Sequence, residues 1–129
     1  MALDTLTVRS ITGRQTTMGA AEETVLLSLN GAAPTASIVV RAGTVCVISD
    51  WGVCAGAPTE WRLQQNNGLG FFDIGLAKVP GIGVNPTKLY SVRTGWVIQG
   101  GPLVAFRVRV STPAGPTMVT TTIRSYTES

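Results

Sequence analysis

Leu103-Val104-Ala105-Phe106-Arg107-Val108-Arg109-Val110-Ser111 is the stretch of sequence that decides the fold. Apolar and polar side chains alternate along it with a period of two. One face carries the apolar side chains of Val104, Phe106, Val108 and Val110. Arg107 and Arg109 fall on the other face. Because successive side chains of a strand point to opposite sheet faces, the pattern predicts an antiparallel strand with one buried face and one solvated face.

The same alternation recurs elsewhere in the chain. In residues 59–64, Trp61 and Leu63 are predicted to face inward, and Glu60 outward. Further strands are expected at 5–10, 24–29, 36–41, 44–49, 71–76, 88–92, 96–99 and 118–124. Gly, Pro and Asn separate these segments at short intervals, which is typical of a β-sandwich or barrel. One or two helical turns are expected within residues 17–24, where alanine and glutamate concentrate.

The length indicates one domain, and the composition indicates that part of its surface is covered by a partner. A chain of 129 residues is of single-domain size. Residues 1–20 are expected to form an N-terminal arm or an edge strand, and residues 21–129 the β-sandwich. Only 13% of the residues are charged, against about 25% in typical domains. Such a surface favours burial against copies of the chain or another protein, so we expect an oligomer.

Nucleic acids and membranes are both disfavoured as partners. Residues 1–73 hold four basic and six acidic side chains, whereas residues 74–127 hold six basic and none acidic. No basic cluster with interleaved aromatic residues appears, which argues for a solvated face over a nucleic-acid site. The start Met1-Ala2-Leu3-Asp4 lacks the pattern of a signal peptide. Uncharged stretches are too short to cross a bilayer, so no membrane partner is expected.

The residues that carry enzymatic chemistry are scarce. The chain has no histidine, the residue that most serine triads and zinc sites need. Asp50, Glu60 and Asp73 are the carboxylates from which a glycosidase pair would have to come. Asp50 precedes an expected turn, and Glu60 is predicted to face solvent. We therefore expect no enzyme, no catalytic residue, no metal and no cofactor.

The two cysteines are a candidate disulfide. Residues 45–54 look like a strand, a turn and a returning strand, which would let Cys46 face Cys54 across the hairpin. The alternative is that both thiols pack as small apolar groups. The missing signal peptide implies a reducing compartment and favours this alternative.

Three aromatic residues are candidate contacts with an oligomer or another partner. Trp51 falls in the expected turn of residues 45–54, so it is the best candidate for an exposed aromatic side chain. Phe71 and Phe72 are adjacent on one strand and must point to opposite faces. One should enter the core, while the other needs a cover such as a second subunit. Trp61, Trp96 and Phe106 are predicted to pack in the core.

The order of segments resembles jelly-roll virion proteins of tailed bacteriophages, namely head decoration (cement) proteins and tail-associated domains. The resemblance rests on Glu60-Trp61-Arg62-Leu63-Gln64 followed by Gly70-Phe71-Phe72-Asp73-Ile74. It also rests on the ending that runs from Gly100-Gly101-Pro102 through Val108 and Pro113 to a threonine-rich last strand. It covers residues 36–127 in style and transfers no functional residue.

The resemblance implies an antiparallel jelly-roll β-sandwich that forms a homotrimer. It further implies a non-enzymatic protein of the virion that binds the major capsid protein, or another virion protein, and stabilises the assembled capsid. The alternative is a β-sandwich that binds a carbohydrate or a host receptor, with a glycan as partner and exposed aromatic side chains near Trp51 or Tyr90.

Overall fold

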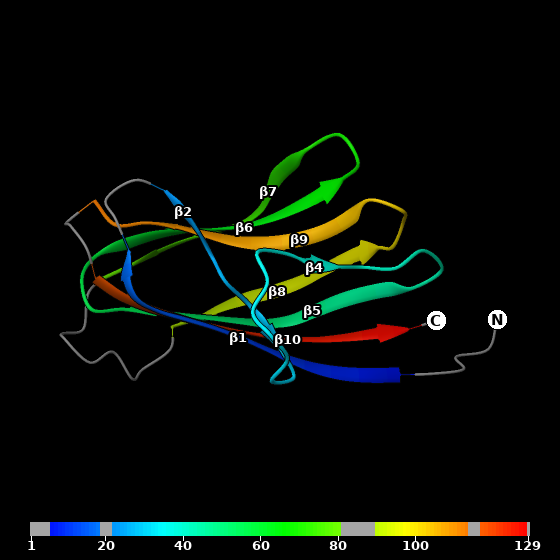
Figure 1. The fold of residues 1–129 in the computed structure, drawn as a ribbon, viewed down its shortest axis with the longest axis horizontal. Helices are drawn as coiled ribbons and strands as arrows, with labels where there is room; N and C mark the ends of the chain where they lie inside the picture. Colours follow the sequence, from blue (N-terminus) through cyan, green and yellow to red (C-terminus); the bar gives the residue numbers. More distant parts are fainter. Residues whose placement is uncertain (1–5, 19–21, 81–89, 114–116, 129) are drawn as a thin grey trace.

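Residues Val104–Ser111 form strand β9, which lies inside one of two antiparallel β-sheets in a computed structural model of the chain (Figure 1). The structure describes residues 6–18, 22–80, 90–113 and 117–128. The other strands are β1 Leu6–Met18, β2 Glu23–Val25, β3 Ser28–Leu29, β4 Ile38–Val39, β5 Val45–Ala55, β6 Thr59–Asn67, β7 Phe71–Val79, β8 Tyr90–Gln99 and β10 Thr117–Glu128. The predicted all-β fold is thereby confirmed.

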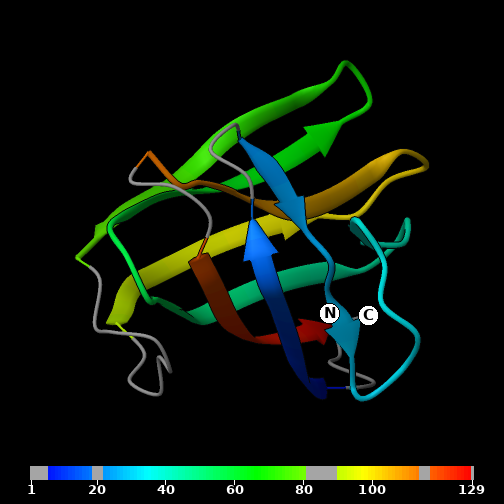
Figure 2. The same cartoon turned by 60° about the vertical axis from the view of Figure 1, so that its left-hand side comes forward.

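The strands form two layers that pack face to face (Figures 1 and 2). Sheet A has the order β3-β1-β10-β5-β8, and sheet B has the order β2-β9-β6-β7, with β4 also paired to β9. All pairs are antiparallel. The pairing is nested: β1 pairs with β10, β2 and β4 with β9, β5 with β8, and β6 with β7.

The core lies between the sheets and is made by the inward faces of their strands. On β9 the predicted inward residues Val104, Phe106, Val108 and Val110 are all buried. On β6, Trp61 and Leu63 are buried and Glu60 is exposed, as the alternation predicts. The opposite layer contributes the buried side chains of Ile11, Cys46, Ile48, Trp51, Val53, Ile98, Val119 and Ile123.

Two local predictions are wrong. The described part of the helix expected within 17–24 is extended, because Met18 belongs to β1 and Glu23 begins β2. Pairing with β10 and β9 outweighs the modest helix propensity of this short segment. The hairpin expected within residues 45–54 is instead the single strand β5, paired along both edges. An irregularity in the pairing of β5, of the β-bulge type, lies between Ile48 and Asp50, within the segment where the sequence suggests a turn.

The first strand that the structure describes is part of sheet A. Residues 6–18 form β1, which pairs with β10 along its length and with β3 only at Ile11 and Thr12. The segments expected at 88–92 and 96–99 join in one strand, β8, and residues 88 and 89 lie outside the described residues. Within the part of the chain that the structure describes, no helix has the length and hydropathy to cross a membrane.

Candidate functional site

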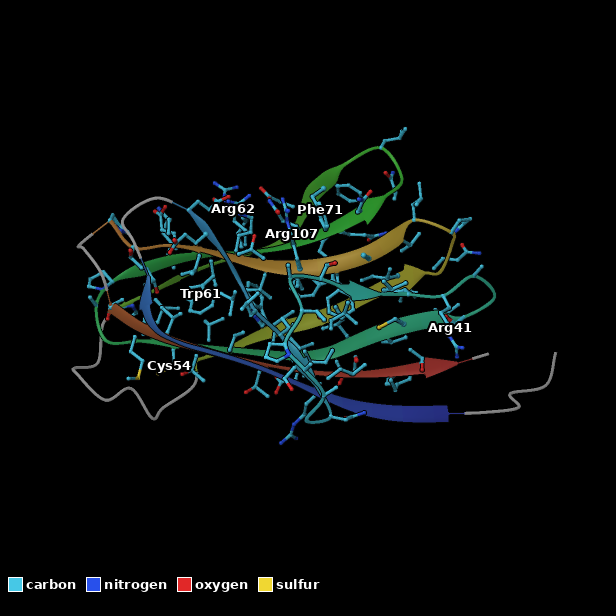
Figure 3. All side chains as sticks on the ribbon, in the orientation of Figure 1. Arg41, Cys54, Trp61, Arg62, Phe71 and Arg107 are labelled. Atoms are coloured by element: carbon cyan, nitrogen blue, oxygen red, sulfur yellow. The ribbon has the colours of Figure 1, made fainter. Side chains whose placement is uncertain are left out.

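The outer face of sheet B carries a row of polar side chains from three strands. Arg107 and Arg109 point outward from β9, away from the buried valines beside them. The register places Arg62 of β6 opposite Arg109, and Gln64 of β6 opposite Arg107. Figure 3 shows Arg62 and Arg107 on the side of the sheet that faces away from Trp61. We call this surface the arginine face.

Glu22, just before β2, holds the two opposed arginines together. One carboxylate oxygen of Glu22 lies 3.1 Å from Nε of Arg62, and the other lies 3.1 Å from Nε of Arg109. Nη2 of Arg109 also donates a hydrogen bond of 3.0 Å to the Glu22 carbonyl oxygen. Like charges directly opposite each other on neighbouring strands are destabilising. The carboxylate of Glu22 offsets that repulsion.

Asp73 of β7 closes the network on the other side. Its carboxylate accepts one hydrogen bond from Nη1 of Arg62 and another, of 2.9 Å, from Nε2 of Gln64. A β-bulge between Leu63 and Gln64 shifts the register of β6 and β7, so that Asp73 pairs with Gln64. The network therefore links β2, β9, β6 and β7 across the whole sheet.

Arg107 has different contacts from its neighbours. Its Nε donates a 2.9 Å hydrogen bond to Oε1 of Gln64, and its guanidinium lies 3.7 Å from the centroid of the Phe71 ring. Partial burial, followed by the charge of Arg109, lowers the pKa of Arg107, and the charge of Glu22 opposes this shift. An arginine with a lowered pKa still carries its charge at neutral pH. Among the described residues, ion pairs reach Arg62, Arg109 and Lys78 but not Arg107.

A shallow hollow adjoins the arginine face beside β7. It is lined by Glu60, Trp61, Arg62, Leu76, Ala77 and Lys78 and holds about 170 Å³. Pockets for small-molecule ligands usually measure about 300–1,000 Å³. The hollow therefore suits a single side chain of a binding partner better than a whole substrate.

Replacing Glu22 with glutamine is expected to lower the free energy of unfolding by about 1 kcal/mol. The variant keeps the size of the side chain but leaves Arg62 and Arg109 opposite each other without the carboxylate between them. The expected loss is small because Arg62 is 42% exposed and Glu22 35% exposed. Urea unfolding monitored by tryptophan fluorescence measures it.

Glu60→Gln is the matched control, since among the described residues Glu60 forms its ion pair with Lys78, whose side chain is 86% exposed. This variant is expected to change stability by less than about 0.5 kcal/mol. In the Glu22→Gln background, the additional Arg62→Gln substitution removes one of the two facing positive charges. It should therefore recover part of the lost stability. An equal effect of the Glu22 and Glu60 variants would contradict the bridging role of Glu22.

Trp51 is buried, so the prediction of an exposed aromatic contact at this position is wrong. Its side chain is 0% exposed, and its ring centroid lies 6.1 Å from that of Trp96. Nε1 of Trp51 donates a 2.9 Å hydrogen bond to Oγ1 of Thr121, which donates in turn to the carbonyl of Gly52. Because β5 continues through Asp50 and Gly52, Trp51 alternates into the core instead of standing on a turn.

Phe71 and Phe72 point to different sides, as predicted, but neither of them belongs to the buried core. Phe71 is half-buried beneath Arg107, whereas Phe72 is 43% exposed. The prediction that one of them enters the core is wrong, because the two residues lie at the start of β7, near the hairpin tip.

Three exposed apolar side chains lie at this end of the sandwich. Leu69 in the β6–β7 loop is 96% exposed, and Leu103 in the loop before β9 is 67% exposed. The two loops touch, since a Cβ atom on Gly68 would lie 3.8 Å from Cβ of Leu103. We call Leu69, Phe72 and Leu103 the tip patch.

The structure does not join the two cysteines. Cys46 and Cys54 both lie on β5 and are buried, but no disulfide joins them. Cys46 pairs with Thr127 and belongs to the core cluster, while Cys54 pairs with Thr120 and lies outside that cluster. The candidate bridge is excluded because cysteines eight positions apart on one extended strand are separated by roughly 26 Å, and the burial of both thiols agrees with the alternative that the sequence favoured.

The three candidate carboxylates do not come together. Asp50 lies on β5 in sheet A, whereas Glu60 and Asp73 lie on sheet B and pair with Lys78 and Arg62. Among the described residues, no group of three or more His, Cys, Asp or Glu side chains is placed to hold a metal ion.

The sequence pattern missed Glu22 as the centre of the arginine face. Its alternation identified Arg107 and Arg109 as outward-facing, but their partners come from strands far away in the chain. The excess of basic side chains in residues 74–127 drew attention to Arg107 and Arg109, but it gave no signal for Glu22 or Arg62.

Comparison with known proteins adds no family assignment. No protein-family model matches the chain, and no curated protein is significantly similar to it in sequence.

Proposed function

We propose that this protein is a non-enzymatic structural component of a virion. In this proposal it is a jelly-roll domain that forms a homotrimer and stabilises an assembled capsid as a decoration protein. The observation that carries the proposal is the nested antiparallel pairing of the strands.

Nested pairing is what a single long hairpin produces when it rolls up into a sandwich. The first strand pairs with the last, β1 with β10, and the innermost pair is β5 with β8 in one sheet and β6 with β7 in the other. Rolling the hairpin then brings β10 beside β5 and β9 beside β6, which is the order of sheets A and B. This order supports a jelly roll, an architecture that viral capsid domains use repeatedly.

Two surface properties support assembly with copies of the chain. The tip patch gathers Leu69, Phe72 and Leu103 at one end of the sandwich, where they are exposed in the single chain. Large apolar side chains exposed at one end of a domain favour a protein–protein contact there. A charged fraction of only 13% agrees with a surface that is partly covered.

The mechanism of such a protein is thermodynamic linkage. A ligand that binds only the assembled state stabilises that state by mass action, in proportion to the logarithm of its concentration relative to Kd. A chain that binds where capsid subunits meet therefore opposes disassembly and needs no catalytic group.

Light scattering on the purified protein tests the trimer. We expect a mass of three times the 13.5 kDa of one chain, and Leu69→Asp is expected to shift the protein to monomer. Leu76→Asp is the matched control, since Leu76 is 63% exposed but lies on β7 outside the tip patch. A monomeric wild-type protein at micromolar concentration would remove the trimer from the proposal.

Co-sedimentation with capsids of the virus that encodes the chain tests the function. The protein should sediment with assembled capsids and raise the temperature at which they disassemble, but should not bind unassembled capsid subunits. Equal binding to assembled and unassembled subunits, or no binding, would overturn the proposal.

A further inference from the structure

We infer that the arginine face is a docking site for a segment of another protein that carries one carboxylate between apolar residues, and that Arg107 binds that carboxylate. The inference rests on the proposed function in taking a protein, the capsid, as the partner. It assigns the contact with the capsid to sheet B and leaves the tip patch for contacts between copies.

Two contacts fix the orientation of the Arg107 guanidinium. Its Nε is used by Gln64, and the Phe71 ring supports its flat face at 3.7 Å. Gln64 is itself fixed by its hydrogen bond to Asp73. The terminal Nη1 and Nη2 groups form the edge that binds a carboxylate with two parallel hydrogen bonds. An arginine fixed in this way loses little side-chain entropy on binding.

The charges around Arg107 favour one carboxylate over a polyanion. Arg62 and Arg109 already contact Glu22 and Asp73, and Lys78 contacts Glu60. These four basic and three acidic side chains leave one net positive charge. Nucleic acids bind through several cations that are each available to a phosphate. The fixed carboxylates of Glu22 and Asp73 would repel a phosphate chain laid across the face.

The surroundings of Arg107 suit a protein partner. Val39, which pairs with Ala105 on β4 and β9, is 60% exposed, and Leu76 of β7 is 63% exposed. These apolar side chains lie on strands on either side of the arginines. Arginine and aromatic side chains are enriched at the energetically important centres of protein interfaces. Arg107 stacked on Phe71 supplies both.

Binding of the purified protein to a short peptide that carries one glutamate between leucine residues, measured by calorimetry at low salt, tests the inference. The same peptide with glutamine in place of the glutamate is the ligand control. The Arg107→Gln and Arg107→Lys variants are compared with Arg124→Gln, which removes the same charge from an exposed position on β10 in sheet A. Arg107→Lys keeps the charge but loses the paired hydrogen bonds and the stacking on Phe71. Thermal unfolding of each variant shows whether the fold is retained.

We expect Arg107→Gln to weaken binding of the glutamate peptide at least about tenfold and Arg107→Lys several-fold, while Arg124→Gln changes it less than about twofold. Single-stranded DNA should bind more weakly than the glutamate peptide. Equal losses in the Arg107→Gln and Arg124→Gln variants would show a mere charge effect and overturn the inference. The absence of binding to the glutamate peptide, or tighter binding to DNA through Arg107, would also overturn it. None of these outcomes depends on the trimer or on capsid binding, so failure here is distinguishable from failure of the proposed function.

Discussion

Replacing Trp51 with alanine is expected to lower the free energy of unfolding by about 3–5 kcal/mol. The Trp51 side chain is completely buried, packs against Trp96 and donates a hydrogen bond to Thr121. Truncation leaves a cavity on the core side of sheet A, because β10 and β8 pair with β5 on its two sides and prevent it from closing the gap. A domain of this size is typically stable by about 5–15 kcal/mol, so the variant is expected to be close to unfolding. Urea or thermal unfolding measured by circular dichroism tests this.

Two variants separate the contributions at this position. Trp51→Phe keeps an aromatic ring but loses the hydrogen bond from Nε1 to Thr121, and we expect a loss of about 1–2 kcal/mol. Phe72→Ala, at a ring that is 43% exposed, should change stability by less than about 1 kcal/mol. A Trp51→Ala protein that is as stable as the wild type but binds its partner differently would instead support the exposed position that the sequence suggested for Trp51.

Gly100→Ala is expected to lower the free energy of unfolding by about 3 kcal/mol. A Cβ atom at this position would overlap the carbonyl oxygen of Arg41 and lie 2.8 Å from that of Thr44. The amide of Gly100 donates a 2.8 Å hydrogen bond to the Thr44 carbonyl, so the two backbone segments are already in contact. Backbone atoms cannot rotate away as a side chain does. The connection between β8 and β9 must therefore move away from the backbone of Arg41 and Thr44, which precedes β5.

Gly101→Ala is the control for this position. Its Cβ atom would lie 3.0 Å from Cγ2 of Val104, a side-chain methyl group that a rotamer change can move. We expect a loss of less than about 1 kcal/mol, measured by the same unfolding experiment. Equal destabilisation by the alanines at Gly100 and Gly101 would contradict the backbone contact as the cause.

Much of the strand content was predictable because strand periodicity is local. The alternation in residues 103–111 identified the buried face of β9, and that in residues 59–64 identified Trp61 and Leu63. Both predictions depend only on the fact that successive side chains of an extended chain point in opposite directions. The same rule placed Arg107 and Arg109 on the outer face.

Local signals failed where a residue's environment depends on strands that are distant in the sequence. Asp50-Trp51-Gly52 resembles a turn, yet β10 pairs with β5 from the other end of the chain and keeps the segment extended. The arginine face depends on the same kind of contact, since Glu22, Arg62 and Arg109 are brought together by the registers of β2, β6 and β9.

The sequence alone therefore established that the chain is built of strands and which side of β9 and β6 is buried, because the geometry of an extended backbone is a local property. The tertiary structure was needed to place Trp51 in the core, to separate Cys46 from Cys54 and to bring Phe71 beneath Arg107. The physical reason is that strand register is chosen by the packing of the whole sandwich, and a shift of one residue would reverse the face of every side chain.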